Sequence, residues 1–370
     1  MCAHGKSRRS IFVYKQSLLS SRIRIKDIAL LAGVSTGTVD RVLHGRGEVN
    51  TETRDRVLSV IRESGYTPNQ AAQTLANRKP VTLAAIIPEG GEANPYWDLP
   101  SQGLLRASNE IRDLNAGIRF YRFRLDERDT FTDQVLHALD DEPDGVVLAP
   151  VFQDEATCLI SKMTSANIPC VLIDTWIDAD VLAAFGQDSR QSGRVAARLM
   201  HYGLSEESAV LVLKLAGPDG IIRHLGQREE GFLEFLIETL PEKRVRIRTE
   251  EADPKDPEGP VRLLNRFFSE EKKPGGIFVP SSRASLVAEF LEATDRTEIP
   301  LVGYDLTQPN IDHLRKGTID FLISQCPEKQ GYQSAISLCK YLIFKQIPLK
   351  INHSPIDIIT RENLDFYLKS

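Results

Sequence analysis

Side chains that could make specific contacts gather on one short predicted helix, 36–43, near the start of the chain. Its apolar side chains share one face, and four residues fall outside that face: Thr36, Gly37, Asp40 and Arg41. Arg41 is the strongest candidate for reading a base, because a guanidinium can donate two hydrogen bonds to one guanine. A surface ion pair with Asp40 or Asp55 is the alternative role. The surrounding elements favour the contact with DNA.

Two further helices and a tight turn are predicted around this helix. Apolar residues recur at helical spacing over 25–32, and Gly33 is placed to end that helix. Ser35 is placed as the N-cap of the second helix. A third amphipathic helix over 53–64 completes a small shared core. This order is a helix-turn-helix, which presents one helix to a DNA groove.

Charge is divided unevenly along the chain. The formal net charge of the whole chain is −5, which taken alone disfavours a nucleic-acid partner. Residues 1–80 hold 14 Lys or Arg against 6 Asp or Glu, whereas residues 81–370 hold 32 against 45. Without residues 1–20 the first part still holds 10 against 6. A basic segment ahead of an acidic body is typical of a DNA-binding domain fused to another domain.

Composition disfavours several classes of protein. At 370 residues the chain is too long for one core, so two or three domains are expected. No apolar run approaches the roughly 18 residues of a membrane span, and the start of the chain lacks the pattern of a secretory signal. Five scattered Cys without a CxxC fit a reducing cytoplasm. Seven dispersed His, and the absence of GxGxxG, GxxxxGKS/T, GxSxG and HExxH, indicate no metal, no cofactor and no enzyme.

The run IKDIALLAGVSTGTVDRVLHGRGEVNTETRDRVLSVIRESGYTPN resembles the headpiece of the lactose-repressor (LacI) family of bacterial transcription regulators. With this resemblance, the headpiece residues that we expect to contact DNA are Thr36, Gly37, Thr38, Asp40, Arg41 and Asn50. Asp40 stands where the family usually has Ser, and could accept a hydrogen bond from cytosine N4 or repel a phosphate. Gly37 lacks the base-reading side chain that relatives often carry. The preferred operator therefore cannot be copied from a relative.

A short fourth helix is expected over 70–76, with Asn69 as its cap. It is too short to persist alone in water. The resemblance identifies it as a hinge helix that folds when two protomers meet over the DNA minor groove. Leu75 falls where the family's intercalating Leu sits, and an apolar wedge there would kink the duplex. The alternative is that Leu75 packs within the headpiece.

From Pro80 onward, apolar strands alternate with helices. The predicted strands are 81–87, 118–125, 145–149, 169–174, 210–215, 245–248, 276–279, 301–304 and 321–324. Such alternation indicates doubly wound parallel sheets, and its length suits two of them. The expected fold class is a small all-α helix-turn-helix headpiece followed by a two-lobed α/β domain.

This body resembles the type I periplasmic-binding-protein fold, and its ribose-binding branch in particular. The resemblance implies three crossovers between the lobes, near Gln187, Asp305 and Gln325. The expected boundaries are a basic, disordered extension at 1–22, a headpiece at 23–67, a hinge helix and linker at 68–79, an N-terminal lobe of 80–187 plus 305–325, and a C-terminal lobe of 188–304 plus 326–370. Ligands of such folds bind in the cleft where strand carboxyl ends face each other.

Candidate ligand contacts follow the predicted strands. Tyr96 and Trp97 could stack on the apolar face of a sugar ring while Asn94 bonds a hydroxyl. Asp174 ends the strand PCVLID and could accept hydrogen bonds from a pair of hydroxyls. The less specific alternatives are a helix cap for Asp174 and a core corner for the two aromatics.

The resemblance adds further ligand contacts. Arg228 matches the family's RxxGF element, whose Arg reaches the ligand, and Asp305 and Gln325 fall at positions that contact sugar. Ser282 stands where many relatives carry Asp or Asn, so Arg283 is an alternative contact there. His224 and Asp188 are weaker candidates.

Together these patterns predict a homodimeric, cytoplasmic transcription regulator, most simply a repressor. Its partners would be pseudo-palindromic operator DNA and a sugar-like effector bound between the lobes, with no membrane contact. The alternative is a cytoplasmic sugar-binding sensor module without specific DNA binding.

Overall fold

The computed structural model describes residues 25–44, 47–64, 79–216, 223–240, 245–253 and 255–368. The chain divides into two units, Met1–Asn77 and Arg78–Ser370. The expected extension at 1–22 and the hinge helix with Leu75 lie outside the described residues.

Three helices form the first unit: α2 (Ile25–Ala32), α3 (Thr36–His44) and α4 (Thr51–Ser64). Gly33 ends α2 in the left-handed conformation, with φ of 64°, which glycine adopts without a steric penalty. Ser35 caps α3, because its Oγ accepts a hydrogen bond from the Thr38 amide at 3.1 Å. A small core is shared by the three helices and consists of Ile28, Ala29, Ala32, Val39, Val42 and Val57. The predicted helix-turn-helix is confirmed.

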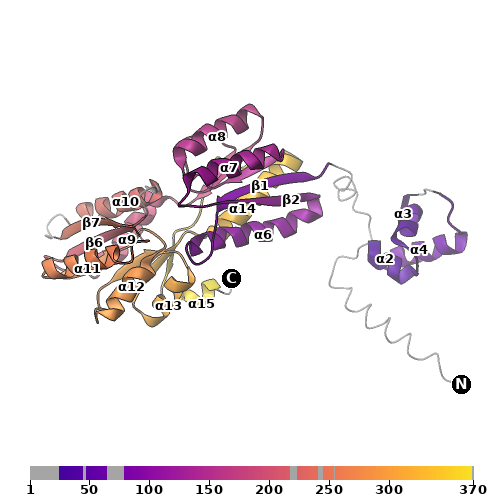
Figure 1. Cartoon of the computed structure of the whole chain (residues 1–370). Helices are drawn as coiled ribbons and strands as arrows, with labels where there is room; N and C mark the ends of the chain where they lie inside the picture. The colour runs from indigo at the N-terminus through magenta and orange to yellow at the C-terminus, as the bar shows by residue number, and fades with distance from the viewer. Residues whose placement is uncertain are drawn as a thin grey trace, which may run out of the picture. The chain divides into compact units, whose positions relative to one another are not determined.

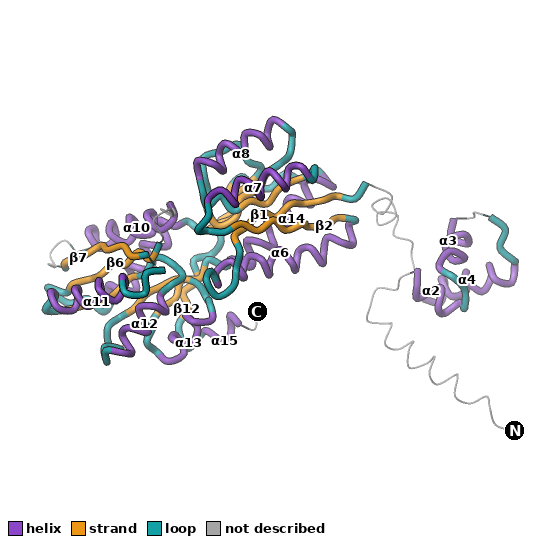
Figure 2. Tube along the Cα trace, viewed as in Figure 1, coloured by secondary structure: helices purple, strands orange, loops and turns teal. Residues whose placement is uncertain are grey.

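Two six-stranded sheets organise the second unit (Figures 1 and 2). The first sheet has the order β11-β5-β4-β3-β1-β2, and all its pairings are parallel. Its strands are β1 (Val81–Pro88), β2 (Ala116–Phe123), β3 (Gly145–Leu148), β4 (Cys170–Asp174), β5 (Ala183–Gly186) and β11 (Ile351–His353). Figure 1 shows α7 (Arg128–Asp140) and α8 (Gln153–Ser165) on the opposite face from α6 (Asp98–Ile111). Helix α14 (Pro327–Phe344) packs beside α6.

The second sheet repeats this order as β12-β10-β9-β8-β6-β7. Only its edge strand β12 runs antiparallel to its neighbour. The strands are β6 (Ala209–Leu215), β7 (Arg246–Ala252), β8 (Pro274–Phe278), β9 (Leu301–Tyr304), β10 (Phe321–Ser324) and β12 (Asp357–Ile359). The covering helices are α9 (Ser189–His201), α10 (Arg223–Thr239), α11 (Gly259–Glu270), α12 (Ala284–Ala293), α13 (Gln308–Lys316) and α15 (Leu364–Leu368). The predicted two-lobed α/β class is confirmed.

The expected division of the C-terminal third between the lobes is wrong. Residues 305–325 were expected in the first lobe, yet β10 pairs with β9 and β12 of the second sheet. Within 326–370, expected in the second lobe, α14 covers the first sheet and β11 pairs with β5. An apolar strand does not reveal which sheet it joins, because both sheets select the same residue types.

The crossings follow from this pairing. The chain passes between the lobes at Gln187, at Gln325 and between β11 and β12. The crossing expected at Asp305 is absent, because Asp305 joins β9 to α13 within the second lobe. The third crossing, at 354–356, was not anticipated.

Candidate functional site

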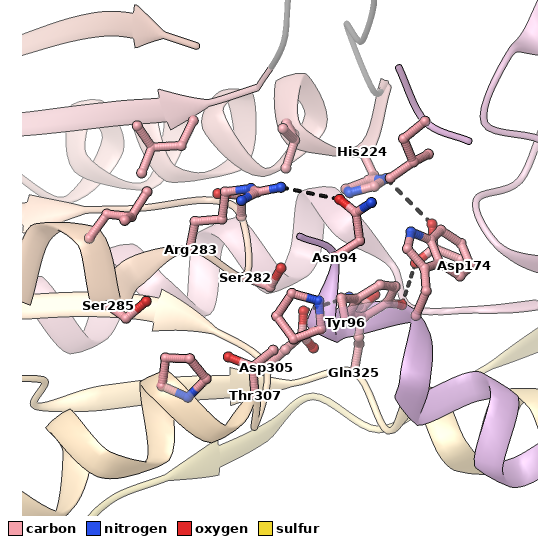
Figure 3. A pocket seen from close by; sticks show the side chains of 18 of the residues that line it. Asn94, Tyr96, Asp174, His224, Ser282, Arg283, Ser285, Asp305, Thr307 and Gln325 are labelled. Carbon is pink, nitrogen blue, oxygen red and sulfur yellow. Dashed lines mark hydrogen bonds and ion pairs between the residues drawn. The ribbon is translucent and has the colours of Figure 1, made fainter. Parts of the chain in front are cut away.

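A cavity of about 270 Å³ opens between the two lobes where strand carboxyl ends face each other (Figure 3). All eight residues predicted to contact ligand line it: Asn94, Tyr96, Trp97, Asp174, Arg228, Ser282, Asp305 and Gln325. His224 and Arg283 line it as well. The fold thus brings the predicted contacts to one place, and their binding of a ligand stays a prediction.

The loop after β1 supplies the aromatic side chains. Pro95 opens a short 3₁₀ helix, η1 (Pro95–Trp97), in which Tyr96 and Trp97 are both buried. Their rings meet edge to face with centroids 5.1 Å apart. The Tyr96 hydroxyl donates to Asp174 Oδ1. Burial and the negative charge of Asp174 hold the pKa of Tyr96 well above its ordinary value, so this hydroxyl remains a donor.

Asp174 ends β4 with both carboxylate oxygens bonded. Its φ is 69°, a left-handed conformation that Asp tolerates better than most residues. Besides Tyr96 at Oδ1, Thr175 Oγ1 donates to Oδ2 at 2.9 Å. The backbone amide of Asp174 donates to Gln330 Oε1 of α14 at 3.0 Å. The side chain is therefore held in place before any ligand arrives.

His224 approaches this corner from the second lobe. Its Nδ1 lies 3.1 Å from Thr175 Oγ1 and 3.8 Å from Asp174 Oδ2. Burial lowers the pKa of His224 to about 4, because a buried imidazolium loses its hydration. The ring is therefore neutral at pH 7.

Asp305 occupies the matching place at the end of β9, with φ of 66°. Its Oδ2 accepts a hydrogen bond from Gln325 Nε2 at 3.0 Å. Its Oδ1 is buried and has no hydrogen-bond partner among the described residues. Burial raises the pKa of Asp305 to about 6. This carboxylate retains a free acceptor at the cavity.

Arg228 is fully buried on α10 and fixes the orientation of Gln325. Its Nη1 donates to the Pro280 carbonyl oxygen at 2.6 Å, and its Nη2 donates to Gln325 Oε1 at 3.1 Å. The guanidinium carbon lies 3.8 Å from the ring centroid of Tyr304. Because Gln325 accepts from Arg228 through Oε1, its amide nitrogen faces Asp305. The three polar side chains form one connected chain.

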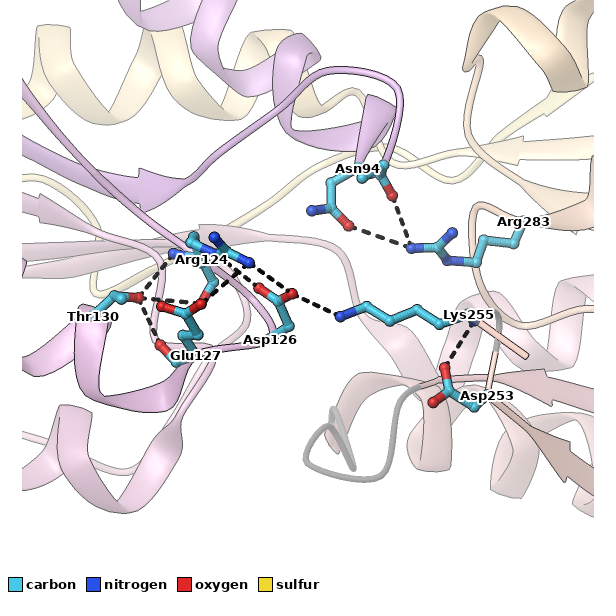
Figure 4. A network of polar contacts seen from close by, with 9 residues as sticks. Asn94, Arg124, Asp126, Glu127, Thr130, Asp253, Lys255 and Arg283 are labelled. Carbon is cyan, nitrogen blue, oxygen red and sulfur yellow. Dashed lines mark hydrogen bonds and ion pairs between the residues drawn. The ribbon is translucent and has the colours of Figure 1, made fainter. Parts of the chain in front are cut away.

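Polar contacts span the lobes at the outer part of the cleft (Figure 4). Arg283 Nη2 donates to the Ala93 carbonyl oxygen at 3.1 Å and to Asn94 Oδ1 at 3.3 Å. Burial lowers the pKa of Arg283 from its ordinary value. Lys255 Nζ lies 2.8 Å from Asp126 Oδ2. Arg283 thus already bonds the first lobe through Asn94.

Two residues that no sequence pattern indicates hold these groups in place. Asn310 is buried, and its Nδ2 donates to the carbonyl oxygens of Ser282, Tyr304 and Asp305. Gln330 bonds the Asp174 amide and the Gln325 carbonyl. Neither residue follows a strand, so the signal that found the others does not apply to them. Further unpredicted lining residues include Glu92, Ser285, Glu289 and Thr307.

Asp188, a weaker candidate, serves a different purpose. Its carboxylate accepts a hydrogen bond from the Gln191 amide at 2.9 Å and so caps α9. It lines a neighbouring pocket, not the cavity described above.

On the first unit, α3 presents its polar face to solvent. Thr36, Gly37 and Arg41 are exposed, and Thr38 and Asp40 are half-buried. Arg41 Nε donates to the Gly37 carbonyl oxygen at 3.3 Å. Asn50 is exposed and caps α4, since its Oδ1 accepts from the Glu52 amide at 3.0 Å. The DNA contacts expected of these residues stay a prediction.

The described residues also bear on two other classes of site. None of the helices in those ranges has the length and apolar character of a membrane span. The same ranges bring together no group of three His, Cys, Asp or Glu side chains fit to hold a metal ion.

Comparisons with known proteins match both units. Residues 24–69 match the family described as bacterial regulatory proteins, lacI family, and residues 85–346 match the periplasmic binding protein domain. A solved structure of a putative LacI transcriptional regulator from Bacteroides fragilis is 31% identical, with a TM-score of 0.71. The match covers 78% of this chain and 100% of that one.

Two curated relatives extend the similarity. The ribose operon repressor of Halalkalibacterium halodurans is 28% identical over 58% of this chain, and the match spans 60% of that protein's length. Catabolite control protein A of Priestia megaterium is 26% identical over 77% of this chain and 83% of its own. The chain therefore belongs to the lacI family of bacterial regulatory proteins.

Proposed function

We propose that this protein is a DNA-binding transcription repressor whose operator affinity is controlled by a neutral sugar-like effector. One observation carries the proposal: a chain with a solvent-facing recognition helix also holds an interlobe cavity with a free buried acceptor, Asp305 Oδ1. The relatives named as operon repressors support the DNA-binding half.

The chemistry of the cavity supports a polyhydroxylated ligand without a strong charge. Asp174 and Asp305 offer hydrogen-bond acceptors, and His224 is neutral. Hydrogen bonds from Arg228 to Gln325 and from Gln325 to Asp305 hold these side chains in place. Arg228 bonds two neutral protein oxygens, and the carboxylates of Asp174 and Asp305 close to it disfavour an anionic ligand. Hydroxyl groups suit such a site, because each can donate to a carboxylate and accept from an amide.

In the proposed mechanism, two protomers bind a pseudo-palindromic operator in the cytoplasm, with α3 in the major groove and Leu75 at the central minor groove. The effector changes the angle between the lobes, and closure is a hinge motion of rigid bodies. Coupling is reciprocal, so operator DNA must change effector affinity by the same factor.

Selection from a random palindromic DNA library, followed by fluorescence anisotropy on the full chain, tests the DNA-binding half. We expect tight binding that falls steeply with salt. Arg41→Ala should relax the sequence preference at one base position, by about 1–3 kcal/mol. Arg62→Ala, an exposed cation at the end of α4, is the matched control and should leave the preference unchanged.

The competing function is a sugar sensor without specific DNA binding. No sequence preference at any salt concentration would favour that sensor and reject the regulator. A thermal-shift screen of sugars checks the effector half, since a ligand at 100 times its Kd adds about 2.7 kcal/mol of apparent stability.

A further inference from the structure

One buried side chain lies where the chain passes between the lobes. Gln187 directly follows β5, forms the first crossing and is only 8% exposed. Its Nε2 donates one hydrogen bond to the Ser324 carbonyl oxygen at 3.1 Å and another to the Pro355 carbonyl oxygen at 2.8 Å. Ser324 ends β10 at the second crossing, and Pro355 lies in the third, between β11 and β12. Gln187 therefore joins all three crossings.

The orientation of this amide is fixed by its partners. Nε2 carries two hydrogen atoms, and the two carbonyl oxygens accept both of them. An inverted amide would place Oε1 against the same two oxygens, and neither of them can donate a hydrogen bond. In the observed orientation Oε1 is buried and has no hydrogen-bond partner among the described residues. The side chain thus holds the crossings through its donor nitrogen.

A backbone hydrogen bond also links the first and third crossings. The Ser354 amide donates to the Gly186 carbonyl oxygen at 2.7 Å. Gly186 is the residue before Gln187, and it lies in register with Asp174 across the pairing of β5 with β4. The first and third crossings are therefore tied at two points, next to a candidate ligand contact.

The second crossing is bonded to residues that line the cavity. Ser324 precedes Gln325, whose side-chain amide donates to Asp305. Gln330 accepts from the Asp174 amide and donates to the Gln325 carbonyl oxygen. A ligand that moves Asp305 or Asp174 would therefore act on the second crossing through these hydrogen bonds.

We propose that Gln187 makes the three crossings turn as one interlobe hinge, and that it is the positioning residue through which a filled cavity sets the angle between the lobes. This inference rests on the proposed effector control and names the residue that transmits it. Closure changes the backbone angles at each crossing. Crossings tied to one amide must turn together, whereas untied crossings can turn separately and give a range of lobe angles. The tie thus favours two discrete arrangements, which coupling between distant sites requires.

Hydrogen–deuterium exchange on the full chain, without ligand, tests the tie. Gln187→Met keeps the length of the side chain and removes its donors. Two hydrogen bonds of ordinary net strength favour the tied state by about tenfold or more, so the amides of all three crossings should exchange faster by that factor. Asn352→Leu is the matched control, because Asn352 Nδ2 also donates to two carbonyl oxygens, those of Ala184 and Leu349, within the first lobe. It should leave exchange at the second crossing unchanged.

Fluorescence anisotropy on the full chain tests the transmission. The probe is the palindrome from the DNA selection, titrated with and without the free pentose or hexose that raises the melting temperature most. The ratio of the two operator Kd values measures the coupling, which a loss of stability alone does not change. We expect a ratio of about 5–150 for the wild type and for Asn352→Leu, and a ratio near one for Gln187→Met.

An unchanged ratio in Gln187→Met, or unchanged exchange at the second and third crossings, would overturn the inference. Equal falls of the ratio in Gln187→Met and Asn352→Leu would also overturn it, because the loss would then follow from any broken amide contact. Gln187→Asn is one methylene too short to reach both oxygens, and it replaces Gln187→Met if that variant folds poorly. If no sugar changed operator binding by the wild type, the proposed effector control would fail, and the exchange rates would still decide whether Gln187 ties the crossings.

Discussion

The two lobes of the body repeat one design and differ at one carboxylate. Both sheets have the same strand order, and a left-handed Asp stands at the end of the fourth strand in each lobe: Asp174 is the last residue of β4, and Asp305 directly follows β9. Asp174 has a bonded partner at each oxygen, whereas one oxygen of Asp305 has none among the described residues. The carboxylate of the first lobe thus has a protein partner at each oxygen, and the carboxylate of the second lobe lacks one.

This difference indicates where a ligand gains most. A buried acceptor without a partner costs about 1–3 kcal/mol, and a ligand hydroxyl that donates to it removes that cost. Each oxygen of Asp174 already accepts one hydrogen bond, from Tyr96 or Thr175, so a ligand hydroxyl there adds a bond without removing such a cost. We therefore expect the second lobe to supply most of the affinity for hydroxyl groups, and the first lobe to supply orientation.

The largest effects on stability should come from two glycines, one in each lobe, at which a pair of helices packs closely. A Cβ at Gly231 would overlap the Arg190 carbonyl oxygen, and a Cβ at Gly103 would overlap that of Glu328. We expect Gly231→Ala and Gly103→Ala each to lower the free energy of unfolding by more than about 3 kcal/mol, because backbone atoms cannot yield cheaply. Denaturant titration followed by circular dichroism measures this.

Gly226→Ala is the matched control on the same helix as Gly231. Nothing lies within 4 Å of its Cβ position, so we expect no loss and a gain of up to about 1 kcal/mol. If only one of the two damaging variants produced a separate unfolding transition, the lobes would be unequal in stability as well as in their carboxylates.

A second effect should appear in the pH dependence of stability. Because the pKa of folded Asp305 is raised to about 6, the folded state keeps a proton that the unfolded chain has already lost between about pH 4 and 6. This group therefore makes the protein more stable as the pH falls from 7 to 5. Asp305→Asn should remove about 1 kcal/mol of that increase, measured as unfolding free energies at the two pH values.

His224 changes the stability of the protein with pH in the opposite direction. Its pKa is lowered to about 4, so the unfolded chain binds the proton first and stability falls on acidification from pH 7 to 5. His224→Gln should therefore make the protein relatively more stable at pH 5. An Asp305→Asn variant with the pH profile of the wild type would contradict the contrast between the two carboxylates.

The smallest effect concerns the ion pair between Asp126 and Lys255, which joins the two lobes at the outer part of the cleft. Lys255 and Asp126 are both solvent-exposed, so their ion pair is weak and screened by salt. We expect Lys255→Ala to weaken binding of the tightest sugar ligand by at most about fivefold at low salt and not at 1 M salt. Arg262→Ala, whose ion pairs stay within the second lobe, should change nothing. A salt-independent loss would contradict a bridging role.

Much of the fold could be predicted from local pattern alone. The continuous apolar runs of β1, β3, β4 and β9 identify buried parallel strands. The strands that were not predicted are short: β5 is the four-residue segment AAFG, and β11 and β12 have three residues each. The sheet partner of β10 could not be predicted, because pairing is a property of distant segments.

The candidate site likewise contains some residues that the sequence predicts and others that it does not. Polar residues directly after strands were predicted, since parallel strands place their carboxyl ends at one edge. Asn310 and Gln330 act from within helices by bonding backbone groups, and no local motif indicates such a contact. The aliphatic residues that line the cavity were missed because Leu and Val after a strand look like any core residue.

The late return of the chain to the first lobe has a consequence for synthesis. Helix α14 and strand β11 complete the first sheet, and both lie within the last 45 residues of the chain. On the ribosome, the sheet face that α6 and α14 share therefore stays partly uncovered until the second-lobe strands up to β10, and then α14, have emerged. The three helices of the first unit need no such wait, because their core is local. In a nascent chain, the DNA-binding helix α3 would thus fold well before the interlobe cavity that is proposed to control it.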